Sequence, residues 1–125
     1  ILLVLAAFVA FAAAPALAGK TFAPYEKAKL EALIQSGAPV VVHVYADWCP
    51  TCRRQITIFD ELFRDPAFAP VQAIRVDYDR DRDFLAAYKV RQQSTILAFK
   101  DGKEVARLAG VTDWSKIRAA IAATL

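Results

Sequence analysis

The stretch Ala46-Asp47-Trp48-Cys49-Pro50-Thr51-Cys52 holds both cysteines of this 125-residue chain. The valine-rich run before it predicts a buried strand, and the residues after it predict a helix, since apolar side chains recur there at helical spacing: Ile56, Phe59, Leu62 and Phe63. Pro50 suits the first position of this helix, where its missing N–H costs nothing. Cys49 then lies at the helix N-terminus, where free N–H groups and the helix dipole stabilise a thiolate. Cys52 follows one turn later on the same face, within bonding reach.

This spacing predicts a dithiol–disulfide switch, in which one thiol attacks a partner and the other resolves the mixed disulfide. A structural zinc site within one chain is disfavoured, because it needs four ligands and the chain adds a single histidine, His43. A structural disulfide across so short a loop would constrain the unfolded chain little. Haem attachment would require a histidine directly after the second cysteine, where Arg53 stands.

The first residues of the chain differ sharply in composition from the rest. Residues 1–17 carry no charge, and Ala16-Leu17-Ala18 fits the small-x-small rule for signal peptidase. We expect residues 1–18 to be a secretory signal whose basic start lies before Ile1, and residues 19–125 to be one domain. An uncleaved anchor is the alternative, because 18 apolar residues barely span a bilayer of ~30 Å. In both cases we expect a periplasmic or secreted domain, where disulfides persist.

The charged residues of the domain argue against nucleic acid as a partner. The formal net charge is +3, and Lys and Arg are interspersed with Asp and Glu, as in residues 79–83. This pattern is typical of a solvated surface. No basic stripe interleaved with stacking aromatics is present.

Helices and strands are expected to alternate along the domain. Spacing and turn residues predict helices over 24–35, after Cys49, over 83–89 and after Thr112 or Asp113. Strands are predicted over 39–45, 71–78, 95–99 and 104–108. The Asp101-Gly102 pair predicts an antiparallel hairpin between the last two strands. The last helix is expected to turn four side chains inward: Trp114, Ile117, Ile121 and Leu125.

Across nearly all of residues 19–125 the chain resembles the thioredoxin family. The resemblance rests on the stretch 46–52, on Arg75-Val76-Asp77, and on residues 97–102 with the helix after Gly110. It implies the thioredoxin fold, an α/β fold with a central mixed β-sheet flanked by helices. It also implies a thiol:disulfide oxidoreductase that needs no organic cofactor, because the dithiol itself carries two electrons.

The resemblance also assigns roles around the dithiol. It implies that Cys49 is the exposed attacking thiol and Cys52 the buried resolving thiol, with Trp48 packed beside them as a shield. The family carries Gly-Pro between its cysteines where this chain has Pro50-Thr51. These two positions help to set the stability of the reduced form, so the direction of electron flow stays open, with reduction favoured.

Two further departures from the family lie near the dithiol. Ser94 stands before Thr95 where thioredoxins have a cis-proline, and we expect a trans Gln93–Ser94 peptide because a non-proline cis bond costs ~3–4 kcal/mol. The Ser94 hydroxyl can then reach a cysteine sulfur, and the docking edge for substrate is reshaped. His43 stands where thioredoxins keep a buried aspartate that accepts the proton of the resolving thiol.

A histidine can perform the same task as that aspartate, because burial favours its neutral, accepting form. The simpler interpretation is a histidine satisfied by hydrogen bonds within the sheet. Arg75 stands where the family has a lysine, and its charge would disfavour imidazolium at His43.

The partners expected from the sequence are protein thiols and disulfides, and a membrane or soluble redox partner that recycles the dithiol in a monomeric protein. Two other functions remain open on the same fold. Loss of the proline at Ser94 implies easier access of metal, so that two subunits can share zinc or an iron–sulfur cluster through four thiolates. The other is a redox-inert interaction module.

Overall fold

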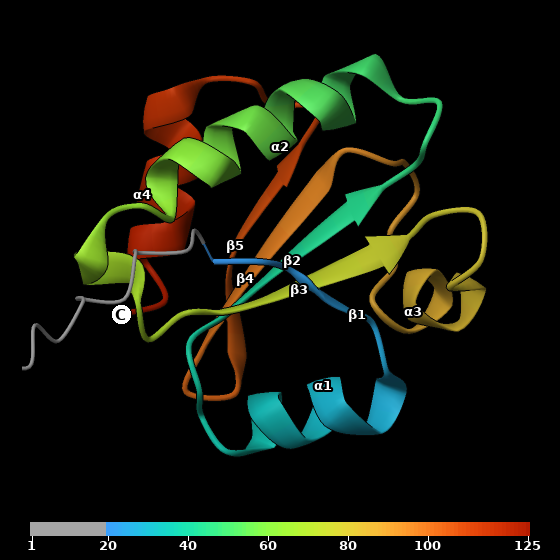
Figure 1. Ribbon diagram of the computed structural model, residues 1–125. Coiled ribbons are helices and arrows are strands. Elements are labelled where there is room, and N and C mark those ends of the chain that lie inside the picture. The colour runs from blue at the N-terminus through green and yellow to red at the C-terminus, as the bar shows by residue number, and fades with distance from the viewer. Residues whose placement is uncertain (1–19) are drawn as a thin grey trace, which may run out of the picture.

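The computed structural model describes residues 20–125, which form a five-stranded sheet between two layers of helices (Figure 1). The elements in chain order are β1 (Ala23–Pro24), α1 (Lys27–Gln35), β2 (Val40–Tyr45), α2 (Pro50–Leu62), η1 (Pro66–Phe68), β3 (Gln72–Asp77), α3 (Arg82–Ala87), β4 (Thr95–Lys100), β5 (Lys103–Ala109) and α4 (Trp114–Ala122). The strand order is β1-β3-β2-β4-β5. β3 runs parallel to β1 and β2, whereas β4 is antiparallel to β2 and β5. The predicted mixed sheet flanked by helices is confirmed.

The central strand β2 is buried on both faces, which explains its unbroken apolar pattern. Val40, Val42 and Val44 face α1 and α3 in one core cluster. Val41 belongs to a second cluster under α2 and α4, and His43 faces the same side, with its ring 5.1 Å from that of Phe59 on α2. The strand therefore presents one polar side chain to the layer that carries the cysteines.

The hairpin between β4 and β5 forms where the sequence predicts it. Asp101 and Gly102 both have left-handed backbone angles, with φ of 51° and 79°. Two such residues in succession give the turn whose twist matches that of the flanking strands. The hairpin holds β4, and with it Ser94 and Thr95 at its start, against β2.

The last helix differs in part from its prediction. Asp113 caps α4 by accepting a hydrogen bond from Lys116 N, and Ile117 and Ile121 are fully buried as expected. The predicted burial of Trp114 and Leu125 is wrong, because these side chains are 41% and 44% exposed. Trp114 begins the helix and Leu125 lies beyond its end at Ala122, so neither shares the buried stripe.

Two segments fall outside these predictions. Strand β1 was not expected, because two residues are too few to show a period, and it pairs with β3 through Ala23 and Pro24. The predicted signal or anchor over residues 1–18 lies outside the described residues. Within residues 20–125, no helix is long and apolar enough to cross a membrane.

Candidate active site

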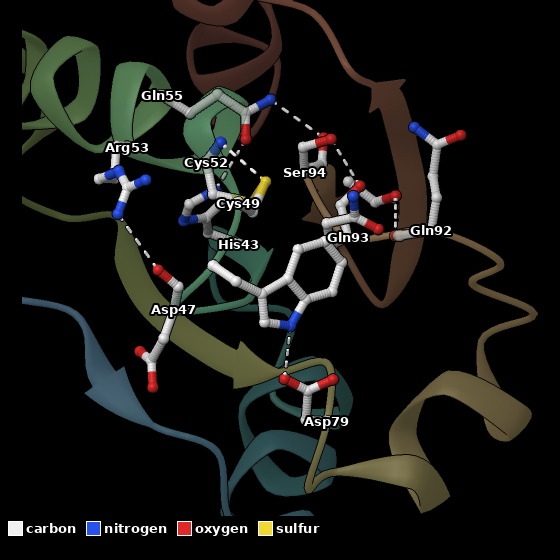
Figure 2. Close-up of a disulfide and its surroundings, with 12 residues drawn as sticks. His43, Asp47, Cys49, Cys52, Arg53, Gln55, Asp79, Gln92, Gln93 and Ser94 are labelled. Carbon is white, nitrogen blue, oxygen red and sulfur yellow. Dashed lines mark hydrogen bonds between the residues drawn. A yellow bond between two sulfur atoms is a disulfide. The ribbon is translucent and has the colours of Figure 1, made fainter.

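The two cysteines form a disulfide at the N-terminal end of α2 (Figure 2). Their Cα atoms are 5.3 Å apart, as the spacing predicts. Cys49 is the N-cap residue of the helix, and its sulfur accepts a hydrogen bond from Cys52 N at 3.1 Å. Pro50 takes the first helical position and Thr51 the next, which confirms the predicted helix start. The helix dipole and this N–H group therefore favour negative charge on the Cys49 sulfur after reduction.

Both cysteines are buried in the disulfide form, Cys49 at 1% exposure and Cys52 at 0%. They cluster with Ala46, and Tyr45 and Tyr78 pack against them. The predicted exposure of Cys49 is wrong for this state, because the bond holds its sulfur against Cys52 and the first turn of α2. Pro50 beside it is exposed and Thr51 half-buried.

Trp48 lies at the rim of the site, where it is 56% exposed. Its indole Nε1 donates a hydrogen bond of 2.9 Å to Asp79, in the loop that follows β3 (Figure 2). The indole is therefore more exposed than a full shield would be and is held by Asp79, and its packing beside the dithiol stays a prediction. Asp79 is a contact that the sequence did not predict.

His43 is fully buried, and its Nε2 lies 2.8 Å from Oε1 of Gln55 on α2. Its other ring nitrogen, Nδ1, is also buried and has no hydrogen-bond partner among residues 20–125. Burial lowers the pKa of His43 from 6.5 to about 3. The hydrogen bond with Gln55 raises this pKa, and the positive charge of Arg75 lowers it further. The imidazole is therefore neutral at physiological pH, with one nitrogen available as an acceptor.

Arg75 pairs in register with His43 across β2 and β3. Its guanidinium lies 4.1 Å from the ring centre of Phe22 and 5.6 Å from that of Tyr45. Burial lowers the pKa of Arg75, with opposing contributions from Tyr45 and Asp60. The predicted electrostatic effect of Arg75 on His43 is confirmed in direction, since its positive charge disfavours imidazolium.

Ser94 immediately precedes β4 and is buried at 4% exposure. The Gln93–Ser94 peptide is trans, as expected, and Ser94 has a φ of 59° in the left-handed region. Its hydroxyl donates to Gln93 O, and its carbonyl accepts from Gln55 Nε2 and Gly110 N, each at 3.0 Å. The predicted bond from this hydroxyl to a cysteine sulfur stays a prediction for the reduced form. Thr95 is buried and donates to Gln92 O at 2.8 Å.

Comparison with known proteins places this site in a family. The family model "Thioredoxin" matches residues 21–123. The chain belongs to the thioredoxin family. The Cys49–Cys52 pair is accordingly the redox centre of a thiol–disulfide oxidoreductase.

Individual relatives support the same assignment. Thioredoxin C-2 of Corynebacterium nephridii is 32% identical over 89 residues, which is 71% of this chain and 82% of that protein. Monothiol glutaredoxin-S17 of Arabidopsis thaliana is 38% identical over 84 residues, 67% of this chain but 17% of that much longer protein. The crystal structure of Trxlp from Edwardsiella tarda EIB202 has a TM-score of 0.73 and 40% identity, and the match covers 77% of this chain and 93% of that one.

The structure places His43 and Ser94, the two positions expected from the sequence to depart from the family, in one hydrogen-bonded network. Gln55 joins them, since its side chain hydrogen-bonds both His43 and Ser94 O. Gln55 was not predicted as a site residue. Its signal in the sequence is a polar side chain on the apolar face of α2, three residues after Cys52.

Within residues 20–125, no group of three or more His, Cys, Asp and Glu side chains is placed to hold a metal ion. A metal shared between two subunits would involve a second copy of the Cys49–Cys52 pair.

Proposed function

We propose that this thioredoxin reduces disulfides in other proteins, with Cys49 as the attacking thiol and Cys52 as the resolving thiol. The observation that carries these roles is the cysteine pair at the N-terminus of α2, with the Cys49 sulfur facing a helix N–H group. The reducing direction rests on the likeness to thioredoxins. That environment stabilises the thiolate, which is the nucleophile in disulfide exchange. Trp48, Pro50 and Thr51 border this end of the helix and form the docking edge together with the Ser94–Thr95 segment.

The reaction proceeds in two exchanges. The Cys49 thiolate attacks one sulfur of the substrate disulfide, so that a mixed disulfide forms and the other substrate sulfur leaves as a thiolate. Cys52 then loses its proton and attacks the Cys49 sulfur, which releases the second substrate thiolate and leaves the Cys49–Cys52 disulfide. The substrate gains two electrons, the protein loses two, and both substrate thiolates take up protons.

We assign the acceptance of the Cys52 proton to His43. Cys52 and Gln55 lie on the buried face of α2, and His43 contacts Gln55 from beneath that face. In the disulfide form Cys52 has no S–H group, and His43 Nδ1 has no partner in the described part of the chain. Reduction supplies a donor at Cys52. Because the pKa of His43 is about 3, Nδ1 passes the proton on to the leaving thiolate or to water and does not retain it.

The composition of residues 1–18 and the disulfide chemistry suggest the cellular setting. We propose that residues 1–18 direct export, that the domain acts in the periplasm or outside the cell, and that a membrane or soluble electron donor returns the disulfide to the dithiol. The uncharged run and the Ala16-Leu17-Ala18 site support export. The mass of the protein isolated from cell fractions tests it, with a mature chain beginning near Gly19 as the expected result.

Trapping the mixed disulfide tests the exchange itself. A Cys52→Ser variant should accumulate a covalent complex with a disulfide-bonded substrate such as insulin, whereas Cys49→Ser should form none. Absence of a complex with Cys52→Ser, or equal trapping by both variants, would contradict the proposed roles.

Metal analysis and light scattering on the wild-type sample test the subunit-shared metal site. We expect a monomer without zinc or iron. A dimer with stoichiometric metal and no exchangeable disulfide would replace the reductase by a metal-binding function.

A further inference from the structure

The side-chain amide of Gln55 has all its hydrogen-bonding groups engaged inside the protein. This residue is fully buried on α2, one turn after Cys52. Its Nε2 donates to two backbone carbonyls, Ser94 O and Val111 O, each at 3.0 Å. Its Oε1 lies 2.8 Å from His43 Nε2. One side chain therefore joins α2 to β2 and to the segment before β4 (Figure 2). It also joins α2 to the segment before α4.

These partners determine which histidine nitrogen carries the proton. Both carbonyls accept hydrogen bonds and cannot donate, so the NH₂ end of the Gln55 amide must face them. The oxygen of the amide then faces His43, and because this oxygen only accepts, His43 Nε2 must donate. In the neutral ring the second nitrogen, Nδ1, consequently has no proton and carries a free lone pair.

We propose that Gln55 is a positioning residue for the resolving step, holding His43 in the tautomer whose unprotonated Nδ1 accepts the proton of Cys52. This inference rests on the proposed role of His43. It adds a residue to the reductase that neither the sequence motif nor the cysteine geometry identifies. Within residues 20–125 the Gln55 side chain hydrogen-bonds His43, Ser94 O and Val111 O and neither cysteine sulfur, so it acts through the imidazole.

The surroundings of His43 leave Gln55 as its only hydrogen-bond partner within residues 20–125. The buried face of α2 carries Cys52, Gln55 and Phe59. The imidazole of His43 contacts Gln55 and Phe59. The other ionisable side chains around the ring are Arg75 from β3 and Tyr45 from β2 itself. β4 contributes apolar Ile96 in register, and Phe22 lies across the ring from before β1.

Nuclear magnetic resonance tests the tautomer directly, because His43 is the single histidine of the chain and its signals need no separate assignment. In the wild-type protein at neutral pH, the ¹⁵N shifts should identify Nε2 as protonated and Nδ1 as unprotonated. A Gln55→Met variant keeps the side-chain length but removes the acceptor that fixes the proton at Nε2, so its spectra should show a mixture of the two tautomers. A wild-type ring protonated at Nδ1, or a Gln55→Met ring that stays wholly protonated at Nε2, would overturn the proposal.

Kinetics separate this role from simple structural support. When the reduced protein reacts with an aromatic disulfide that releases a coloured thiolate, the first release reports attack by Cys49 and the second reports resolution by Cys52. Near pH 7, Gln55→Met should slow the second release by about 3–10-fold and leave the first within about 2-fold. The expected slowing is smaller than the factor on the order of 10²–10⁴ that a pKa-matched base contributes, because the pKa of His43 is about 3. The slowing should fade at alkaline pH, where hydroxide removes the Cys52 proton.

Two controls complete the experiment. Gln35→Met makes the same substitution at an exposed position at the end of α1 and should change neither release. In a His43→Gln background, Gln55→Met should cause no further slowing of the second release. Equal slowing of both releases, or additive slowing with His43→Gln, would assign Gln55 a structural role only. If His43→Gln alone leaves the second release unchanged, His43 is not the proton acceptor and that part of the proposed function is wrong. The tautomer of His43 is decided separately by the ¹⁵N spectra.

Discussion

Replacing His43 with glutamine should remove most of the pH dependence of folding stability on the acid side of neutrality. The pKa of this side chain is 6.5 in the unfolded chain and about 3 when buried. Between these values the unfolded state binds a proton that the folded state does not, so the free energy of unfolding falls as the pH decreases. The contribution of the buried, neutral His43 to the free energy of unfolding is complete above about pH 6.5 and is lost progressively towards pH 3.

The size of the effect follows from the two pKa values. One pKa unit corresponds to about 1.36 kcal/mol, so the interval from 6.5 to about 3 amounts to roughly 5 kcal/mol. Between pH 7 and pH 4 the wild-type protein should lose about 3 kcal/mol through His43 alone, a large share of a typical total of ~5–15 kcal/mol. His43→Gln has no titrating group at this position and should not show this loss.

Urea unfolding of the oxidised protein at pH 7, 6, 5 and 4 provides the measurement. The two proteins share every other ionisable group, so subtracting the variant from the wild type isolates the histidine. The difference should grow by up to about 1.4 kcal/mol for each pH unit below 6.5. Parallel stability curves, or a wild-type His43 resonance that titrates near pH 6.5 in the folded protein, would refute the reasoning.

Substitutions at three further positions test the packing of the core, the backbone conformation at Ser94 and the hydrogen bond at the rim of the site. Phe59→Ala removes a fully buried ring that contacts His43 and should lower the free energy of unfolding by about 3–5 kcal/mol in urea titrations. Ser94→Gly should raise the free energy of unfolding by up to about 1 kcal/mol, because glycine adopts the left-handed φ without strain. Ser94→Pro cannot adopt that φ and should lower the free energy of unfolding by about 3 kcal/mol. In a Trp114→Phe background, Asp79→Ala should increase the mobility of the exposed Trp48 indole, measured as a faster decay of fluorescence anisotropy, while stability changes by less than about 1 kcal/mol.

Much of this fold could be predicted from the sequence because its strongest signals are local. Valines in succession require a strand buried on both faces, Pro50 marks a helix start, and Asp101-Gly102 selects one kind of turn. These signals depend on backbone preference and burial, which act within a few residues. The two-residue β1 gives no such signal, since its pairing with β3 is set only by the tertiary structure.

The site was predictable to the extent that its chemistry lies in consecutive residues. The cysteine pair is evident from its spacing, and the resemblance to thioredoxins singles out His43. The bond from Gln55 to His43 and Ser94 joins residues 12 and 39 positions apart and could not be read from spacing. The same holds for Asp79, which is 31 positions from Trp48. The low exposure of Cys49 depends on Tyr45 and Tyr78, which the fold brings to it.

The reduction potential of the Cys49–Cys52 pair tests the central claim most directly. The protein is equilibrated in glutathione or dithiothreitol buffers of graded potential, and the fraction of dithiol is measured at each. A disulfide reductant should give a value below about −220 mV, towards the −270 mV typical of thioredoxins. A value near −120 mV would identify a disulfide donor instead, and the proposal that this protein reduces its substrates would be wrong.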